Sequence, residues 1–203
     1  MKDNIAGNYY NKYETQNPIS KWFINRFTQR LSLILRDLSF SSLLEVGCGE
    51  GYLLQRLEKQ LKDVDILASD ISPEIIDKAN SIIPGVPKII ASAYDLPLED
   101  KSKDVVLACE VMEHVQEPMK LLKEAKRIAR KNCIFTVPHE PWWRIANVMR
   151  GKYLGDFGNT PGHIQHWNKN SLMKLIDSTF EISEHEYVGL WQFVVVKADS
   201  KAK

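Results

Sequence analysis

Short apolar runs alternate with longer amphipathic stretches along most of the chain, and this alternation limits the fold more than any other feature. The first five runs are separated by helical or turn-rich segments, which is typical of an α/β sheet whose parallel strands are joined by helical crossovers. The last two runs have almost no spacer between them and predict a hairpin. The expected strands are 42–47, 65–70, 86–92, 103–110, 132–138, 180–189 and 190–198.

The chain has 203 residues, an ordinary length for one domain and enough to bury a sizeable core. Residues 1–38 carry apolar side chains at helical spacing and predict an N-terminal helical cap, whereas residues 198–203 are expected to form a tail. Residues 139–167 hold three of the five tryptophans in a long stretch without a sheet role. Because long loops in compact domains are usually functional, we interpret 139–167 as a substrate-binding lid.

Composition limits the partners that the chain can have. The formal charge is only +1, so we expect no DNA partner, and RNA stays an open alternative. No run approaches the roughly 18 apolar residues of a membrane span, which predicts no transmembrane segment and leaves peripheral membrane contact open. The three cysteines are scattered in or beside apolar runs, which favours reduced thiols and a cytoplasmic location. We expect a monomer or a weak dimer.

Three glycines spaced two apart follow the first expected strand in "LLEVGCGEG": Gly47, Gly49 and Gly51. Ligands of α/β sheets gather at the carboxyl ends of strands, and glycine lets a ligand approach the backbone closely. A dinucleotide-binding turn would carry a glycine at the sixth position of its pattern, where this chain has Tyr52. A nicotinamide-dependent oxidoreductase is therefore disfavoured.

Acidic residues around this turn favour a ligand that carries a positive charge. Glu45 and Glu50 would repel a pyrophosphate, but they would suit the cationic amino acid end of a cofactor. Asp70 ends the second strand, at the spacing where a carboxylate accepts hydrogen bonds from ribose hydroxyls. Together these residues predict a nucleoside with a positively charged group.

The segments "LLEVGCGEG", "LASDIS" and "ASAYDLPLEDKSKDVVLACEVMEHV" follow the order of the motifs of class I S-adenosylmethionine-dependent methyltransferases. From about residue 40 to 137 the chain resembles the methyltransferase type 11 and ubiquinone O-methyltransferase-like members of this superfamily. The resemblance implies a three-layer, Rossmann-like α/β fold with helices on both faces of a seven-stranded sheet whose last strand is reversed. It also implies a single methyltransferase domain over 1–203 that uses S-adenosyl-L-methionine.

The resemblance further implies a cofactor-binding role for ten positions. The glycines would pass beneath the methionine part, Glu45 would face its ammonium group, and Glu110 would lie beside the same end. Asp70 would bind the ribose hydroxyls, and Ile71 would pack on the adenine. Ser92 departs from the family pattern, because many members carry an aspartate there. The implied residues are Glu45, Gly47, Gly49, Gly51, Asp70, Ile71, Ser92, Ala93, Tyr94 and Glu110.

Methyl transfer to an oxygen also needs a general base, or a metal that lowers the pKa of the acceptor. The segment "EVMEH" places Glu110, Glu113 and His114 at positions i, i+3 and i+4, which a helical turn would put on one face. His163, near the end of the aromatic segment, can return to the same place in the fold. We therefore expect His114, His163 and Glu113 to be catalytic residues.

The same residues resemble the metal site of 2′-O-methyltransferases that act on small-RNA 3′ ends. That resemblance implies Glu110, Glu113, His114 and His163 as ligands of a divalent metal. Two carboxylates with two imidazoles suit Mn, Fe or Zn better than Mg. Because many related methyltransferases carry this motif without a metal, a catalytic base, a metal site and purely structural histidines all stay open.

The acceptor is expected to contact residues 139–167. Aromatic side chains there can enclose an apolar or aromatic acceptor, and an arginine can hold its carboxylate or phosphate. The expected substrate residues are Trp142, Trp143, Arg144, His166 and Trp167. The leading hypothesis is O-methylation of a small-molecule acceptor. The alternatives are a metal-dependent 2′-O-methyltransferase acting on an RNA 3′ end and a non-catalytic protein that binds S-adenosylmethionine.

Overall fold

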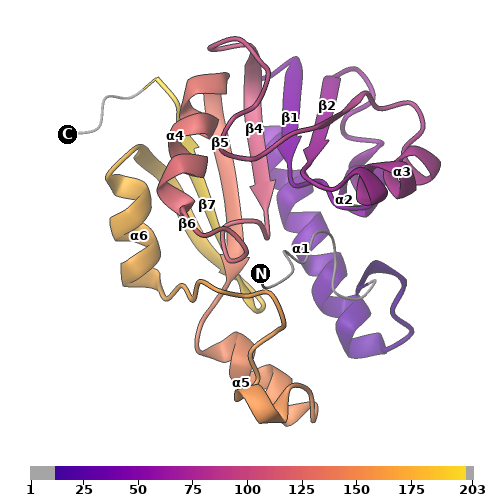
Figure 1. Cartoon of the computed structure of the whole chain (residues 1–203), viewed down its shortest axis with the longest axis vertical. Helices are drawn as coiled ribbons and strands as arrows, with labels where there is room; N and C mark the ends of the chain where they lie inside the picture. Colours follow the sequence, from indigo (N-terminus) through magenta and orange to yellow (C-terminus); the bar gives the residue numbers. More distant parts are fainter. Residues whose placement is uncertain (1–11, 200–203) are drawn as a thin grey trace.

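A mixed sheet of seven strands forms the centre of the computed structural model, which describes residues 12–199 (Figure 1). The strands lie in the order β3-β2-β1-β4-β5-β7-β6. Neighbours from β3 to β5 are parallel, whereas β7 runs antiparallel to both β5 and β6. The predicted hairpin and reversed last strand are therefore confirmed. The strands are β1 Ser42–Val46, β2 Asp65–Asp70, β3 Lys88–Ile90, β4 Lys103–Cys109, β5 Ala129–Pro138, β6 Glu181–Val188 and β7 Trp191–Lys197.

Helices α1, α3 and α6 begin after residues whose side chains accept hydrogen bonds from free backbone N–H groups. The hydroxyl of Ser72 accepts a hydrogen bond from the Ile75 N–H, and Pro73 fills the first position of α3, as the sequence predicts. The side chain of Asn17 caps α1 in the same way. The helical elements are η1 Lys12–Glu14, α1 Pro18–Asp37, α2 Tyr52–Leu57, α3 Pro73–Ile82, α4 Pro118–Ile128, α5 Trp142–Met149, η2 Leu154–Asp156 and α6 Lys169–Asp177.

Side chains that alternate along the strands build two separate cores. In β4, Val106 and Ala108 belong to one core and Val105 and Leu107 to the other, as the two-residue period of a strand requires. Helices α4 and α6 cover the first face of the sheet, and α1, α2 and α3 cover the second. The predicted three-layer arrangement with helices on both faces is confirmed.

Two strands differ from their predicted ranges by more than one residue at an end. Strand β5 begins at Ala129, three residues before the expected start at 132, because α4 ends at Ile128 and Ala129 already pairs with Lys103 of β4. The polar residues 130–132 continue the charge pattern of the helix and hide this change in the sequence. Strand β3 is limited to Lys88–Ile90, at the edge of the sheet, instead of the expected 86–92.

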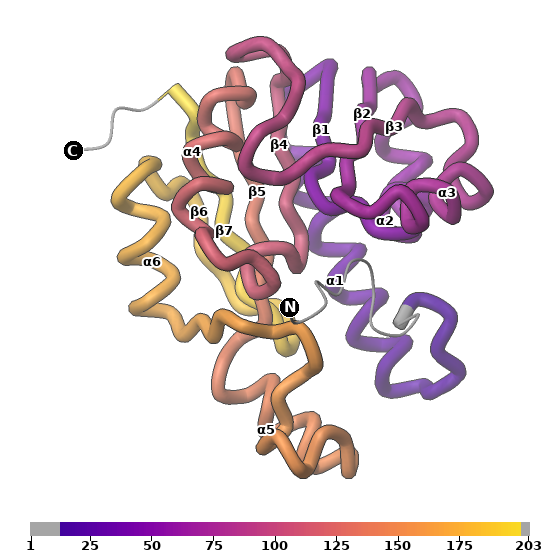
Figure 2. Tube along the Cα trace, viewed as in Figure 1, coloured from indigo at the N-terminus to yellow at the C-terminus, as the bar shows by residue number. Residues whose placement is uncertain are grey.

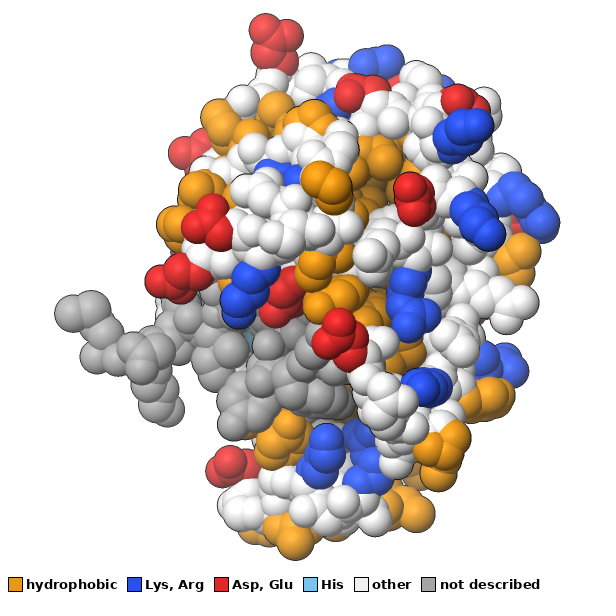
Figure 3. All heavy atoms as spheres, turned by 90° about the vertical axis from the view of Figure 1, so that its right-hand side faces the viewer, with side chains coloured by type: hydrophobic (Ala, Val, Ile, Leu, Met, Phe, Trp, Pro, Cys, Tyr) orange, Lys and Arg blue, Asp and Glu red, His pale blue; other side chains and the backbone are white. Residues whose placement is uncertain are grey.

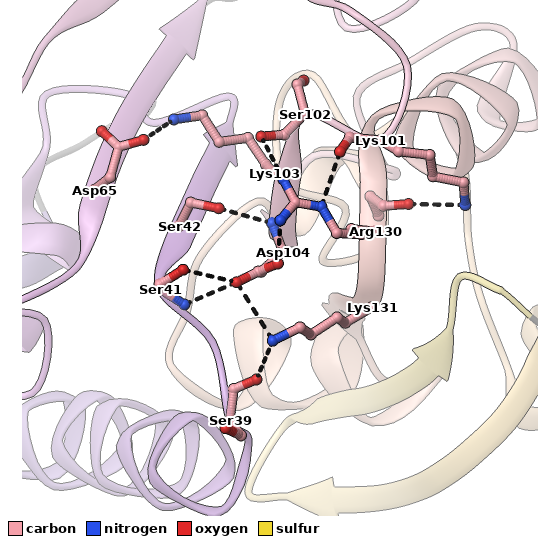
Figure 4. A network of polar contacts seen from close by, with 11 residues as sticks. Ser39, Ser41, Ser42, Asp65, Lys101, Ser102, Lys103, Asp104, Arg130 and Lys131 are labelled. Carbon is pink, nitrogen blue, oxygen red and sulfur yellow. Dashed lines mark hydrogen bonds and ion pairs between the residues drawn. The ribbon is translucent and has the colours of Figure 1, made fainter.

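A polar network joins the first residues of β1 and β4, at the end of the sheet opposite the glycine turn (Figure 4). The buried carboxylate of Asp104 accepts hydrogen bonds from the backbone N–H and the hydroxyl of Ser41, at 2.9 and 3.1 Å. Arg130 and Lys131 lie 3.2 and 3.5 Å from the same carboxylate. Burial alone would raise the pKa of Asp104, but Ser41 and the two cations hold it below its ordinary value.

The segment between β5 and α6 leaves the sheet, forms α5 and η2 beyond its end, and returns (Figure 2). The sequence pattern predicts neither of these two helices. Residues 1–11 of the expected cap and 200–203 of the expected tail lie outside the described residues. Within 12–199, no helix combines the length and apolar character that a membrane crossing requires. Cys48, Cys109 and Cys133 form no disulfide bond with one another.

Candidate functional site

The glycine turn after β1 is built so closely that two of its positions require glycine. Gly47 has a φ of +68°, and a Cβ there would lie 2.6 Å from Cγ2 of Val111. Gly51 has a φ of +88°, and its Cβ would lie 2.7 Å from Cδ1 of Ile83. Side chains rarely adopt such φ values, and contacts this short force neighbouring atoms to move. The turn therefore lies directly against the segment that follows β4.

Asp70 holds the same turn from the end of β2. One carboxylate oxygen accepts a hydrogen bond from the Gly49 N–H at 3.0 Å, and the other accepts one from the Ser72 N–H at 3.1 Å. Each carboxylate oxygen can accept a second hydrogen bond, so the group keeps capacity for a ligand. Ile71, next to it, exposes more than half of its side chain at this edge.

Glu45 is a buried acid near the end of β1, two residues before the first glycine of the turn. Only 2% of the residue is exposed, and its Oε2 has no hydrogen-bond partner among residues 12–199. Burial, together with the nearby carboxylate of Asp70, raises the pKa of Glu45 to about 8. A buried acid beside another acid lacks a cation, so these residues fit a ligand whose ammonium group supplies that charge.

The loop after β3 carries the three residues expected at the adenine edge. The hydroxyl of Ser92 accepts a hydrogen bond from the Tyr94 N–H at 3.2 Å. The phenol oxygen of Tyr94 accepts one from the Glu117 N–H at 3.0 Å, which ties this loop to the start of α4. Ala93 packs against the core on the α4 face. The backbone groups of this loop thus occupy positions fixed by neighbours on both sides.

Glu110 does not join the group of residues expected around it. It adopts a φ of +56° and is followed by a turn, not by the helical turn that the spacing predicted, so that prediction is wrong. Its carboxylate instead accepts a hydrogen bond from the indole N–H of Trp191. The left-handed residue turns this side chain away from the direction a helix would give it. The predicted set of four metal ligands is therefore not assembled.

Glu113, His114 and His163 are brought together, although 49 residues separate the two histidines in sequence. One ligand atom from each of the three lies within 4.8 Å of the others. The two imidazole centroids are 4.9 Å apart, with their planes at 82°. His114 Nδ1 lies 3.0 Å from the carbonyl oxygen of Gly162. Because a carbonyl only accepts, Nδ1 carries the proton of the neutral ring and Nε2 keeps its lone pair.

Backbone contacts hold the two halves of this cluster together. The carbonyl oxygen of Glu113 accepts hydrogen bonds from the N–H groups of Ile164 and Gln165, at 2.9 and 3.1 Å. The ring of Trp143, on α5, stacks on His163 with centroids 6.0 Å apart. Its indole N–H donates to Thr160 Oγ1 at 3.0 Å. The cluster is thus fixed before any ligand binds.

The expected substrate residues are spread over different surroundings. Trp143 lies beside His163, whereas Trp142 is mostly exposed. The guanidinium of Arg144 donates to the carbonyl oxygen of Phe157 and so holds the turn after α5. His166 Nδ1 is 3.6 Å from the buried carboxyl of Glu140. Trp167 is buried in the core under α4 and α6.

Tyr13 and Trp191, which are not among the predicted site residues, lie beside Glu110. Glu110, Trp191 and Tyr13 line a shallow depression together with Ile24 and Phe27 of α1. Burial raises the pKa of Tyr13 well above its ordinary value, and the charges of Cys109 and Glu45 add to the effect. Tyr13 also stacks on Tyr52 of α2. The tyrosine-rich stretch "NYYNKY" was the only sign of this contact in the sequence.

Comparisons with known proteins agree with this geometry. Residues 44–137 match the family described as "Methyltransferase domain". Over 90 residues the chain is 31% identical to malonyl-(acyl-carrier protein) O-methyltransferase of Hahella chejuensis, which covers 43% of this chain and 32% of that protein. The chain thus spans about a third of the length of this curated relative.

Solved structures share the fold at lower identity. A protein of Pyrococcus horikoshii superposes with a TM-score of 0.72 and 19% identity, over 93% of this chain and 94% of that one. Magnesium protoporphyrin IX methyltransferase of Synechocystis, solved with bound SAH, superposes with a TM-score of 0.66 and 16% identity, over 90% and 88%. At these identities the likeness shows the fold alone.

Proposed function

The domain matched by residues 44–137 belongs to the class I S-adenosylmethionine-dependent methyltransferases, and on this premise we propose that the chain methylates an oxygen of a small-molecule acceptor. One observation carries the proposal. His114 comes three residues after Val111, which lies against Gly47, and the His114 N–H donates to the Val111 carbonyl oxygen at 3.0 Å, so we infer that the His114–His163 pair lies beside the turn expected to hold the methyl donor. An acceptor hydroxyl bound between the His114 imidazole and the glycine turn would contact both the base and the methyl donor.

The residues of the glycine turn fit the proposed cofactor. Glu45 offers a buried carboxyl that lacks a cation, and Asp70 keeps acceptor capacity for two ribose hydroxyls. Ile71 and the loop of Ser92 would flank the adenine. When bound, S-adenosylmethionine supplies a methyl group on a sulfonium that is already activated. The chain therefore needs mainly to align the acceptor and exclude water.

His114 is the proposed general base. Its Nδ1–H donates to the Gly162 carbonyl oxygen, so Nε2 is the nitrogen that would accept the proton of the acceptor hydroxyl. The edge of its ring meets the His163 ring, which is itself stacked on Trp143. The proposed role of His163 is to orient this imidazole, and that of Glu113 is to balance its charge once it is protonated.

A metal-dependent 2′-O-methyltransferase on an RNA 3′ end is the second proposal, and the three-residue cluster is the observation that favours it. Two imidazoles and one carboxylate are a donor set that binds Mn, Fe or Zn. Glu110 is not part of that set, because its carboxylate is bonded to Trp191. The Nδ1–H of His114 donates to a backbone carbonyl, which is the usual outer contact of a metal-bound histidine.

One assay separates these proposals. The chain is incubated with S-adenosylmethionine and either the small-molecule fraction or the RNA fraction of a cell extract, and S-adenosylhomocysteine formation is measured. The leading proposal predicts turnover with the small-molecule fraction that resists EDTA. The second predicts turnover with RNA that EDTA abolishes and that falls steeply with salt. Binding without turnover in either fraction would leave a non-catalytic binding protein and contradict both.

The compartment proposed for this activity is the reducing cytoplasm. Cys48 and Cys133 are buried free thiols, and burial raises the pKa of both above the ordinary value of a thiol. Buried, protonated thiols are inert towards exchange but would form disulfides if the chain unfolded in an oxidising compartment.

A further inference from the structure

The α5 projection, which we define as residues 141–158, carries an apolar tip that no other described part of the chain covers. Met149 is 83% exposed, Phe157 78% and Leu154 61%, and Ile145 and Val148 are exposed beside them. The projection extends beyond the end of the sheet, away from both cores (Figures 1 and 2). An apolar cluster of this kind on a protein surface usually marks an interaction site.

The tip is hollowed rather than flat. A cavity of about 430 Å³ lies between α5 and η2, lined by Arg144 and six apolar residues of the projection. Arg144 ties the turn that lines this cavity to α5, because its guanidinium donates to the backbone carbonyls of Phe157 and Asp156. The apolar surface is therefore a built feature of the fold.

The charges around the tip are mostly positive. Within 141–158 the charged residues are Arg144, Arg150, Lys152 and Asp156, which leaves an excess of two positive charges on a chain whose total is only +1. In the side view, Lys and Arg side chains gather above the apolar atoms at the lower end of the molecule, where the projection lies (Figure 3). An apolar tip with a cationic collar matches the two layers of an anionic membrane surface, acyl chains below phosphates.

We propose that the α5 projection docks on the surface of an anionic lipid bilayer. Met149, Leu154 and Phe157 enter the acyl boundary, and the cations of the collar lie at the level of the lipid phosphates. Trp142, which is 56% exposed, lies at the start of α5, where an indole suits the interface between the two layers. The charge excess favours this occupant over a second copy of the chain, whose own collar would repel it.

Docking in this way brings the membrane close to the candidate site. Trp143 lies on the same helix as the tip, and its ring stacks on His163. Asn147 donates to the Gly158 carbonyl at 2.8 Å and ties the helix to the returning chain. The proposal does not depend on methyl transfer, since it concerns the outer side of α5 only.

Vesicle flotation tests the proposal with the full chain. One set of vesicles contains phosphatidylcholine alone, and the other contains about one quarter phosphatidylglycerol. The variant Met149→Asp with Phe157→Asp removes the tip, and Met149→Leu with Phe157→Leu keeps it apolar as a matched control. Phe157 has a φ of +50°, which aspartate tolerates, so the charged variant should fold. Thermal melting of both variants checks this directly.

We expect the chain and the Leu variant to float with the anionic vesicles, and the Asp variant to lose about tenfold or more of its partition coefficient. Raising the salt from about 0.1 M to about 0.5 M should also weaken binding, because the collar acts through screened charges. A chain that floats with neither vesicle, or an Asp variant that melts and floats like the Leu variant, would overturn the proposal. It would also be overturned if ultracentrifugation showed a dimer that the Asp variant alone disrupts, without vesicle binding.

Discussion

The imidazole rings of His114 and His163 meet edge to face, with centroids 4.9 Å apart and planes at 82°. The two residues come from different parts of the chain, one from the turn after β4 and the other from the segment that returns from α5. Their contact joins the part of the sequence that carries the methyltransferase motifs to the part that carries the projection. A substitution in either part should therefore change the rate of the proposed methyl transfer.

Replacing His114 by glutamine should lower kcat by about 10²- to 10⁴-fold, because the proposed general base is lost. The affinity for S-adenosylmethionine should stay within about twofold, since the cofactor residues are untouched. Steady-state kinetics with the acceptor found by the extract assay, together with calorimetry, measures both quantities. His185→Gln, on β6, is the matched histidine control. If His114→Gln keeps kcat within about threefold of that control, His114 is not the base.

Replacing Gly47 by alanine should destabilise the fold by about 1–3 kcal/mol and weaken cofactor binding. The new Cβ would meet Val111 at 2.6 Å in a backbone conformation that side chains avoid. Urea unfolding and calorimetry report the two effects. Gly85→Ala serves as the control, because no atom lies within 4 Å of a Cβ there. Equal stability of the two variants would show that the glycine turn is looser than described.

Glu45 should make the ligand-free protein less stable as pH rises. Its pKa is about 8 in the folded chain and 4.5 in the ordinary carboxyl, so between these values the folded state holds an extra proton. The contribution of this proton to the free energy of unfolding is fully present below pH 4.5. It falls by up to a few kcal/mol as pH rises from 4.5 to about 8. The free energy of unfolding of the chain minus that of Glu45→Gln, measured from pH 5 to 8, should fall across this range. A flat difference contradicts the burial of an unpaired acid.

Asp104→Asn should cost about 2 kcal/mol of stability and leave cofactor affinity unchanged. The lost interactions are the charge-assisted hydrogen bonds from Ser41 and the ion pairs with Arg130 and Lys131. Because the folded pKa of Asp104 is lowered, its contribution is present at neutral pH and is lost as pH falls through the folded pKa. Urea unfolding at neutral and acidic pH measures the change. Weakened cofactor binding would mean that the two ends of the sheet are coupled.

Much of the fold could be predicted from the sequence, because the buried central strands read as apolar runs and the caps are local signals. Ser72 and Pro73, for example, indicate the start of α3, and the contacts involved lie within four residues of each other. The start of β5 could not be predicted, since Ala129 enters the sheet only through its pairing with Lys103, more than twenty residues away. The strand propensity of a residue reflects its neighbours in sequence, whereas the pairing register of a strand depends on its neighbours in space.

The candidate site shows the same division. The spacing of Glu113 and His114 was visible, and their meeting with His163 was expected from the resemblance. The different path of Glu110 depends on one left-handed residue and on Trp191, which comes from the last strand. Tyr13 reaches the site from the N-terminal side of α1 by packing on Tyr52. Apart from the tyrosines of "NYYNKY", no pattern along the chain indicates these contacts between distant segments.

The central claim is that the glycine turn between Glu45 and Asp70 binds S-adenosylmethionine, and isothermal titration calorimetry tests it most directly. Titration at about pH 7 in two buffers that differ in ionisation enthalpy should show one site. It should also show proton release, because the cofactor's ammonium lowers the pKa of Glu45. Glu45→Gln should bind without that release, and NAD should give no heat. No heat with S-adenosylmethionine, or binding of NAD in its place, would contradict the account.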